Sequence, residues 1–181
     1  MIYIILGIVV VILLYVVAIY NSLVGLRNKV GDQSSQIEVE LKRRFDLVPN
    51  LVETVKGYAK HESETLENII AARNEYANAG SVQEGLEADK SLTGAISKLF
   101  ALAENYPDLK ANQVFLDLQN ELSEIEQQIV YKREFYNETV RKYIDKIQMF
   151  PSSIVAKMFN FKEAEYFKAT ESEKENVKVK F

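Results

Sequence analysis

Cysteine is absent from the 181-residue sequence, and histidine occurs once, at His61. The absence of cysteine excludes disulfide bonds, iron–sulfur clusters, cysteine-ligated zinc, a thiol nucleophile and a lipoprotein-type acylated cysteine. A single histidine excludes every site that needs two imidazole groups. Several common classes of metal and redox site are therefore ruled out before any motif is considered.

Glycine and proline are scarce, with seven and three residues, and long stretches contain neither. This scarcity favours helices over a turn-rich β fold. The 22 basic and 26 acidic residues give a net charge of −4 without a long basic run. That balance argues against nucleic acid as a partner, and the length allows one domain of ordinary size.

Charged side chains are also absent from the N-terminal stretch, where the first is Arg27 and residues 1–20 are apolar except for Gly7. Twenty helical residues span about 30 Å, which is the thickness of the hydrocarbon core of a bilayer. Tyr15 and Tyr20 come late in this run, where an amphipathic ring can lie at headgroup level. We therefore predict an uncleaved transmembrane helix over residues 1–20, with membrane lipid as a partner.

A cleaved signal peptide and a buried soluble helix are the alternatives for residues 1–20. A signal peptide carries basic residues before a shorter apolar core and ends at a small-residue cleavage site, and this stretch does not follow that pattern. The rest of the chain cannot easily enclose a helix that is apolar all round. Because Arg27 and Lys29 follow the run, the positive-inside rule predicts an outside N-terminus and a cytoplasmic folded region.

Beyond residue 20, apolar residues recur at three- and four-residue steps, which is the spacing of one helix face. The predicted helices cover 21–48, 49–79, 82–105 and 112–149. Lys132 alone interrupts the apolar pattern of the last one. Since short connections favour antiparallel neighbours, we predict an all-α fold in which a transmembrane helix precedes an elongated antiparallel four-helix bundle over 21–149.

The positions of glycine and proline bear on where these predicted helices begin, end or bend. Gly25 and Gly31 weaken the first helix and leave open whether it continues the membrane helix or bends away from it. Pro49 suits the first turn of a new helix or a kink. Ser81 with Glu84 has the form of a capping box, which marks the start of the third helix.

A basic run, Lys42-Arg43-Arg44, lies more than twenty residues past the predicted anchor. An extended helix places it about 30 Å from the membrane, several Debye lengths away, which disfavours lipid binding. Glu38–Lys42 and Glu40–Arg44 are pairs at i,i+4 spacing, so a solvated, self-paired helix face is the interpretation we favour. Contact with a protein partner is the alternative.

Residues 150–169 form an amphipathic segment rich in phenylalanine, and we expect the charged tail over 170–181 to be disordered. The predicted last helix is about 57 Å long, and the first extends about 42 Å beyond the membrane, so the segment can reach the lipid surface. It is either an interfacial foot or oligomer contact, or a cover over the open end of the bundle core, which we favour. The candidate interface or membrane-proximal residues are Phe150, Pro151, Met158, Phe159, Phe161 and Phe167.

No motif of catalysis or cofactor binding is complete. His61-Glu62 begins like a zinc-protease motif, but Thr65 stands where the second histidine is needed. Gly80 and Gly85 have the spacing of a phosphate loop without the lysine that should follow, and a Gly-x-Ser-x-Gly turn is absent. We therefore predict a protein that is not an enzyme, without a catalytic, cofactor-binding or metal site, and with His61 as a surface helical residue.

Several longer motifs are typical of one protein family. The strongest is LKRRFDLVPNLVETVKGY at 41–58. Further matches are Tyr20-Asn21-Ser22-Leu23-Val24, Ser35-Gln36-Ile37, Ala72-Arg73, residues 106–112, Tyr136-Asn137 and Phe150-Pro151. On these residues the sequence resembles the LemA family over nearly the whole of 15–167. Two places depart from the family pattern: Asp145 stands where that family usually has asparagine, and Asn160 stands where it usually has glycine.

The resemblance implies a bacterial single-pass membrane protein with a long antiparallel helical domain on the cytoplasmic side and no established catalytic activity. Some relatives are implicated in forming membrane organelles, which fits a scaffold. We therefore expect a membrane-anchored, non-enzymatic scaffold or interaction protein that forms homo-oligomers, with a membrane protein as a further candidate partner. The alternative is an adaptor or regulator of a membrane-bound enzyme or sensor.

Overall fold

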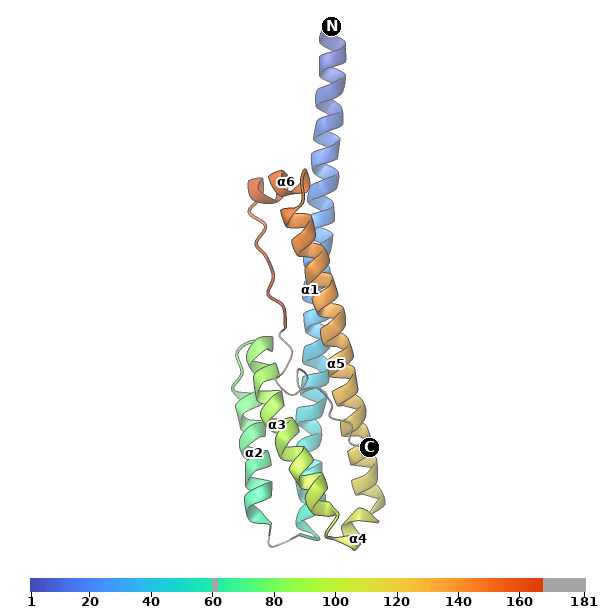
Figure 1. Ribbon diagram of the computed structural model, residues 1–181, viewed down its shortest axis with the longest axis vertical. Coiled ribbons are helices and arrows are strands. Elements are labelled where there is room, and N and C mark those ends of the chain that lie inside the picture. The colour runs from blue at the N-terminus through green and yellow to red at the C-terminus, as the bar shows by residue number, and fades with distance from the viewer. Residues whose placement is uncertain (60–61, 168–181) are drawn as a thin grey trace, which may run out of the picture. The chain divides into compact units, whose positions relative to one another are not determined.

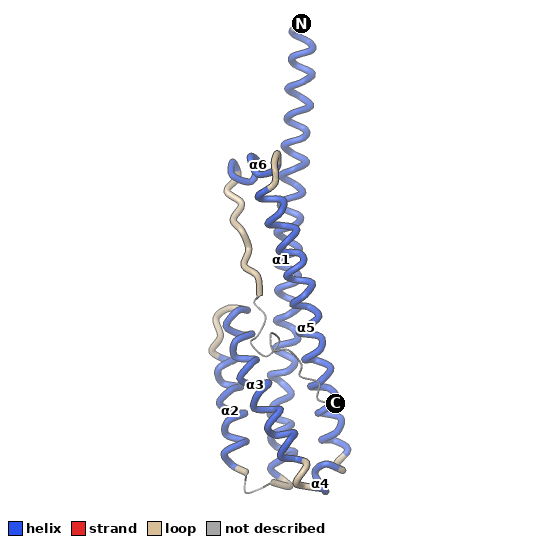
Figure 2. The backbone as a smooth tube through the Cα atoms, viewed as in Figure 1, coloured by secondary structure: helices blue, strands red, loops and turns tan. Residues whose placement is uncertain are grey.

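The computed structural model describes residues 1–59 and 62–167. Within these two ranges every regular element is an α-helix and no strand occurs (Figure 1, Figure 2). The helices are α1 (Ile2–Lys56), α2 (Ser63–Ala77), α3 (Val82–Ala103), α4 (Pro107–Lys110), α5 (Gln113–Gln148) and α6 (Ser152–Met158). The predicted all-α class is confirmed. The expectations for His61 and for the tail at 170–181 fall outside the described residues.

The chain divides into two compact units. The terminal unit contains Met1–Asp32 and the chain from Glu134 onward, and the central unit contains Gln33–Arg133. Helices α1 and α5 therefore contribute residues to both units. Helices α2, α3 and α4 belong to the central unit alone, and α6 belongs to the terminal unit.

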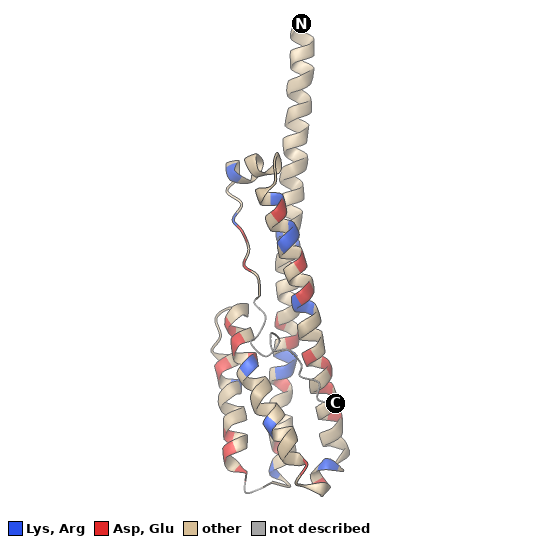
Figure 3. Ribbon diagram, viewed as in Figure 1, with Lys and Arg blue, Asp and Glu red and all other residues tan. Residues whose placement is uncertain are grey.

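Helix α1 is a single helix of 55 residues. Its first part shows no charged residue in Figure 3 and contains an 18-residue window with a mean hydropathy of 3.2, of which 6% is buried. Among the described residues it is the one helix that is long and apolar enough to cross a membrane, judged by length and composition. The question of continuity is answered, because α1 passes through Gly25 and Gly31 without a break.

The expected helix boundary at Pro49 is not observed, because α1 continues to Lys56. A proline inside a helix costs about 3 kcal/mol, since it lacks the N–H donor and crowds the preceding turn. Pro49 itself is exposed, but four apolar side chains around it are at most 4% exposed: Val48, Leu51, Val52 and Val55. Burial of each contributes about 1.5–3 kcal/mol, which outweighs the penalty. The helix expected from residue 49 begins instead as α2 at Ser63.

The hydrophobic core of the central unit draws side chains from α1, α2, α3, α4 and α5. Each of these five helices supplies at least one leucine or isoleucine that is at most 1% exposed. Examples, in chain order, are Leu51, Ile69, Leu99, Leu109 and Leu122. The predicted helix faces therefore meet in one core, while their up-and-down order stays a prediction.

The turn between α2 and α3 is fixed by the predicted helix cap. The backbone N–H of Glu84 donates to the Ser81 hydroxyl at 3.2 Å, and the Glu84 carboxylate accepts from the N–H of Gly80 at 2.7 Å. A side chain at Gly85 would bring its β-carbon within 3.3 Å of the Tyr76 ring. Glycine at this position thus allows the start of α3 to approach Tyr76 closely.

In the terminal unit, the chain after α6 returns as a loop to Phe167 (Figure 2). The Phe167 ring lies 4.2 Å from the Tyr136 ring, between centroids, and its backbone N–H and C=O bond the side-chain amide of Asn137, each at 2.9 Å. The return begins at Asn160, whose φ of 54° lies in the left-handed region. Asparagine tolerates that region better than other non-glycine residues, which explains how it fills a position where glycine is usual.

Candidate functional site

The six predicted interface residues lie in the terminal unit, where their surroundings differ. Phe167 is buried, and Pro151 is half-buried after a cis peptide bond. Phe150 and Met158 are 80% and 68% exposed. The segment therefore combines a covering part with an exposed part, and its role as a contact stays a prediction.

Phe159 and Phe161 meet Tyr20, the last residue of the apolar run. Their ring centroids lie 4.7 and 5.7 Å from that of Tyr20. The guanidinium carbon of Arg27 lies 5.4 Å from the centroid of the Phe161 ring, within the range of a cation–π contact. The C-terminal segment is thus joined directly to the end of the candidate membrane span.

Helix α6 carries apolar side chains on two faces. Val155 and Ala156 are buried, together with Ser152. Ile154 and Met158 are one turn apart on the opposite side and are 56% and 68% exposed. With the exposed flanking residues they form what we name the α6 apolar face: Met149, Phe150, Ile154, Met158 and Phe159. Several exposed apolar side chains within one short segment are typical of a surface that another molecule or a membrane covers.

A buried ionic network crosses the central unit. Arg44 on α1 is 1% exposed, and its Nη1 donates to both carboxylate oxygens of Asp89 on α3, at 2.9 and 3.1 Å. Its Nη2 lies 3.5 Å from a carboxylate oxygen of Glu126 on α5. Burial raises the pKa of Asp89, and the charge of Arg44 opposes that rise. Because an unpaired charge in this position is costly, the network constrains how α1, α3 and α5 are aligned.

This network corrects the expectation that the basic run is a solvated face paired along one helix. Lys42 does pair within α1, but its partner is Asp46, at 2.9 Å, and not the expected Glu38. Arg44 binds α3 and α5 instead of Glu40. Glu40 accepts a hydrogen bond from Lys132 at 2.7 Å, which explains the one charge that interrupts the apolar pattern of α5.

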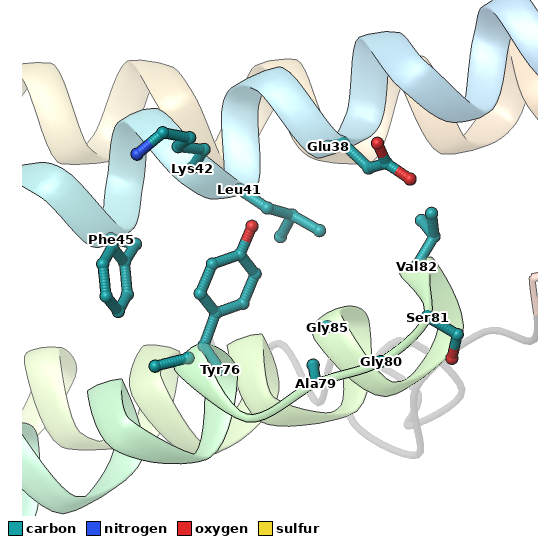
Figure 4. Close-up of a pocket in the computed structure, with 11 residues that line it drawn as sticks. Glu38, Leu41, Lys42, Phe45, Tyr76, Ala79, Gly80, Ser81, Val82 and Gly85 are labelled. Carbon is teal, nitrogen blue, oxygen red and sulfur yellow. The ribbon is translucent and has the colours of Figure 1, made fainter.

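A groove of about 490 Å³ lies between α1 and the α2–α3 turn (Figure 4). Leu41 and Phe45 of α1 face Tyr76 of α2 there, and the rings of Phe45 and Tyr76 are 5.2 Å apart between centroids. Glu38 and Lys42 add charged groups to the lining. Burial raises the pKa of Tyr76, so its hydroxyl stays protonated at neutral pH. The groove is suited to an apolar group with a polar end.

The chemistry available for catalysis is limited in the described part of the chain. Residues 1–59 and 62–167 contain no group of three or more His, Cys, Asp or Glu side chains that could hold a metal ion. The Ser81 hydroxyl in the groove is used as the cap of α3. That the protein is not an enzyme stays a prediction.

Asp89 and Glu126 are the residues of the network that the sequence does not single out, and Asp89 is the closer partner of Arg44. Asp89 follows Leu86 by three residues and precedes Leu92 by three, and both leucines are buried. Arg44 stands in the same kind of position on α1, three residues after Leu41. The sequence signal that could have revealed the buried pair is therefore a charged residue within the apolar stripe of each of two helices, one acidic and one basic.

Comparison with known proteins gives a consistent family. The sequence profile of the LemA family matches residues 33–181. The chain is 30% identical over 162 residues to Protein LemA of Metamycoplasma hominis, with 87% of this chain and 72% of that protein covered.

Two further relatives carry the name of a magnetosome protein. The chain is 26% identical over 174 residues to Magnetosome protein MamQ 2 of Paramagnetospirillum magneticum, and 25% identical to Magnetosome protein MamQ of Magnetospirillum gryphiswaldense. In both cases 82% of this chain is covered. The chain spans 64% of the length of each of these relatives.

Proposed function

Because the chain belongs to the LemA family, we propose that it is a membrane-anchored, non-enzymatic helical scaffold that associates with copies of itself at the bacterial membrane. The observation that carries the proposal is the continuity of α1. This helix contains the candidate membrane span and, without a break, the buried residues Val48, Leu51 and Val55 of the central unit. A protein-binding domain that shares one helix with the span is tethered to the membrane.

The scaffold is an antiparallel four-helix bundle formed by the later part of α1, α2, α3 and α5. Two features support this arrangement. The helices share one core, and the connections between them are short, which favours antiparallel neighbours. The buried pairing of Arg44 with Asp89 and Glu126 fits such a bundle, because it links three of its helices at one level.

The N-terminus lies outside and the bundle lies in the cytoplasm. Arg27 and Lys29 are the first charged residues after the apolar run, and the positive-inside rule places such residues in the cytoplasm.

Self-association is tested on the full-length protein in native-lipid nanodiscs by mass photometry, after extraction from its own membranes. We expect particles that contain more than one copy. Retention in the membrane pellet during alkaline carbonate washing tests the anchor separately. Release from the pellet would contradict the anchor, and single copies in nanodiscs and in crosslinked native membranes would contradict self-association.

An adaptor or regulator of a membrane-bound enzyme or sensor is the second candidate. The groove beside Tyr76 favours it, because an apolar lining with Lys42 and Glu38 nearby suits one inserted side chain of a client protein. Proximity labelling from the central unit should then recover one stoichiometric membrane protein. Recovery of this chain alone would favour the scaffold.

A further inference from the structure

We infer that the α6 apolar face is a second contact with the lipid bilayer, so that the protein is held both by its span and by a short interfacial foot. This inference rests on the proposed membrane anchor. The exposed side chains of the C-terminal segment thereby contact lipid, whereas its buried side chains pack within the protein.

Helix α6 and its flanks are poor in charge and rich in apolar side chains. Between Met149 and Phe161 the only charged residue is Lys157. Val155 and Ala156 already pack against the terminal unit, yet Phe150, with 80% of its surface exposed, remains uncovered. The exposed side of α6 therefore offers apolar area and one cation, and membrane binding at the interface increases with the apolar area that is buried there.

Helix α6 lies close to the end of the candidate membrane span. Tyr20 ends a run of apolar residues that is about 30 Å long as a helix, so its ring falls at headgroup level when the run spans a bilayer. The ring of Phe159, which follows α6 directly, lies 4.7 Å from Tyr20. Figure 1 shows α6 beside α1 at the end of α5, within the terminal unit. The α6 apolar face is therefore placed where lipid begins.

Two cationic side chains lie beside the C-terminal segment. Arg27 is held against Phe161, and Lys157 lies in the last turn of α6. Long cationic side chains beside buried apolar groups extend toward lipid phosphates while their stems stay in the apolar layer. Both cations are thus suited to the headgroup region that the foot would occupy.

The size of the face argues for lipid over a second copy of the chain. Helix α6 has seven residues and is therefore about 10 Å long. A stable protein interface buries about 800 Å² on each partner, far more than one face of such a helix provides. Insertion into a bilayer needs no such minimum area, because each apolar side chain contributes on its own.

The sequence contains no tryptophan, so an introduced one reports its own surroundings. We propose Ile154→Trp in the full-length protein, reconstituted in vesicles of phosphatidylethanolamine and phosphatidylglycerol with acyl chains brominated near the headgroup. Ile154 is 56% exposed, so the larger side chain meets no packed core. We expect emission shifted to the blue that falls when brominated lipid replaces the unbrominated lipid, because the side chain then lies between headgroups and acyl chains.

Tyr166→Trp is the matched control. Tyr166 is 42% exposed and belongs to the same unit. It precedes Phe167, which packs on Tyr136. Tyr136 lies about 18 Å along α5 from Gln148, the end of the helix that is next to α6. This variant should show no quenching. Met158→Trp, on the same face as Ile154, should give the same quenching. Agreement between the two variants would show that the quenching does not come from a local distortion caused by a single substitution.

The inference is overturned if bromine quenches Ile154→Trp and Met158→Trp no more than Tyr166→Trp. A blue shift without quenching that disappears when the protein is diluted with lipid also overturns it, and would assign the face to a second copy. Carbonate resistance of the same samples separates the two proposals. A retained protein without quenching rejects the foot alone, whereas a released protein rejects the anchor.

Discussion

Arg44 and Asp89 bring opposite charges into the interior of the central unit. We expect Asp89→Ala to lower the free energy of unfolding by about 3–5 kcal/mol, because the guanidinium then stays buried without its closest partner. Urea unfolding of the full-length protein in detergent, followed by circular dichroism, measures this. The exposed Lys42–Asp46 pair is the control, and Asp46→Ala should cost about 0–1 kcal/mol. Equal effects of the two substitutions would contradict the buried pair.

Asp89 also predicts a pH dependence of stability. Burial raises its pKa above the ordinary value of 3.8, and Arg44 opposes the rise. The folded protein then binds this proton more tightly than the unfolded chain does, so the contribution is complete below pH 3.8 and is lost as pH rises through the raised pKa. The unfolding free energy of the parent relative to Asp89→Asn should therefore fall with rising pH in urea titrations. A difference that grows with pH would exclude a raised pKa.

Asn160 is constrained by its backbone, with a φ of 54°. Asn160→Val should lower the free energy of unfolding by about 1–2 kcal/mol, because a β-branched residue is strained in the left-handed region. Asn160→Gly should keep or raise stability. Thermal unfolding of both variants measures the effect, and Lys162→Val, an exposed change in the same segment, serves as the control. Equal stability of the valine and glycine variants would show that the return after α6 does not need this conformation.

Among the elements, α3 depends on its N-terminal cap. Ser81→Ala removes the acceptor for the N–H of Glu84 and should cost about 1 kcal/mol of unfolding free energy, whereas Ser81→Asp should retain most of it. The same change at Ser91, exposed within α3, should have little effect or stabilise slightly, since alanine is the better helix former. Urea unfolding compares the three variants, and a loss at Ser91 equal to that at Ser81 would count against the cap.

The elements also show where sequence reasoning succeeds. The start of α3 at Val82 and the end of α5 at Gln148 lie within one residue of the predicted limits, because a buried helix face and a capping residue leave local patterns. Pro49 could not be judged locally, since its penalty is offset by side chains that become buried only through other helices. The partner of Arg44 was hidden for the same reason, because Asp89 is 45 residues away and only helix packing brings the two together.

At the scale of the whole molecule, the proposed orientation can be tested because the chain lacks cysteine and any introduced thiol is unique. Ile2 and Val114 are 75% and 57% exposed, and they lie at the start of α1 and of α5. The positive-inside rule, applied to Arg27 and Lys29, places the outer end of the span, where Ile2 lies, at the outer surface and Val114 in the cytoplasm. A membrane-impermeant maleimide should therefore label Ile2→Cys in intact protoplasts.

Val114→Cys should react with the same reagent only after permeabilisation, and this difference is the measurement that decides orientation. Labelling in detergent gives the control for each variant, since both thiols must then react. The reverse pattern would mean that the two cations beyond Tyr20 do not determine the topology. It would leave the anchor and the foot in place, with α6 at the outer leaflet, and it would move the groove to the outer side of the membrane, where its client would be a different protein.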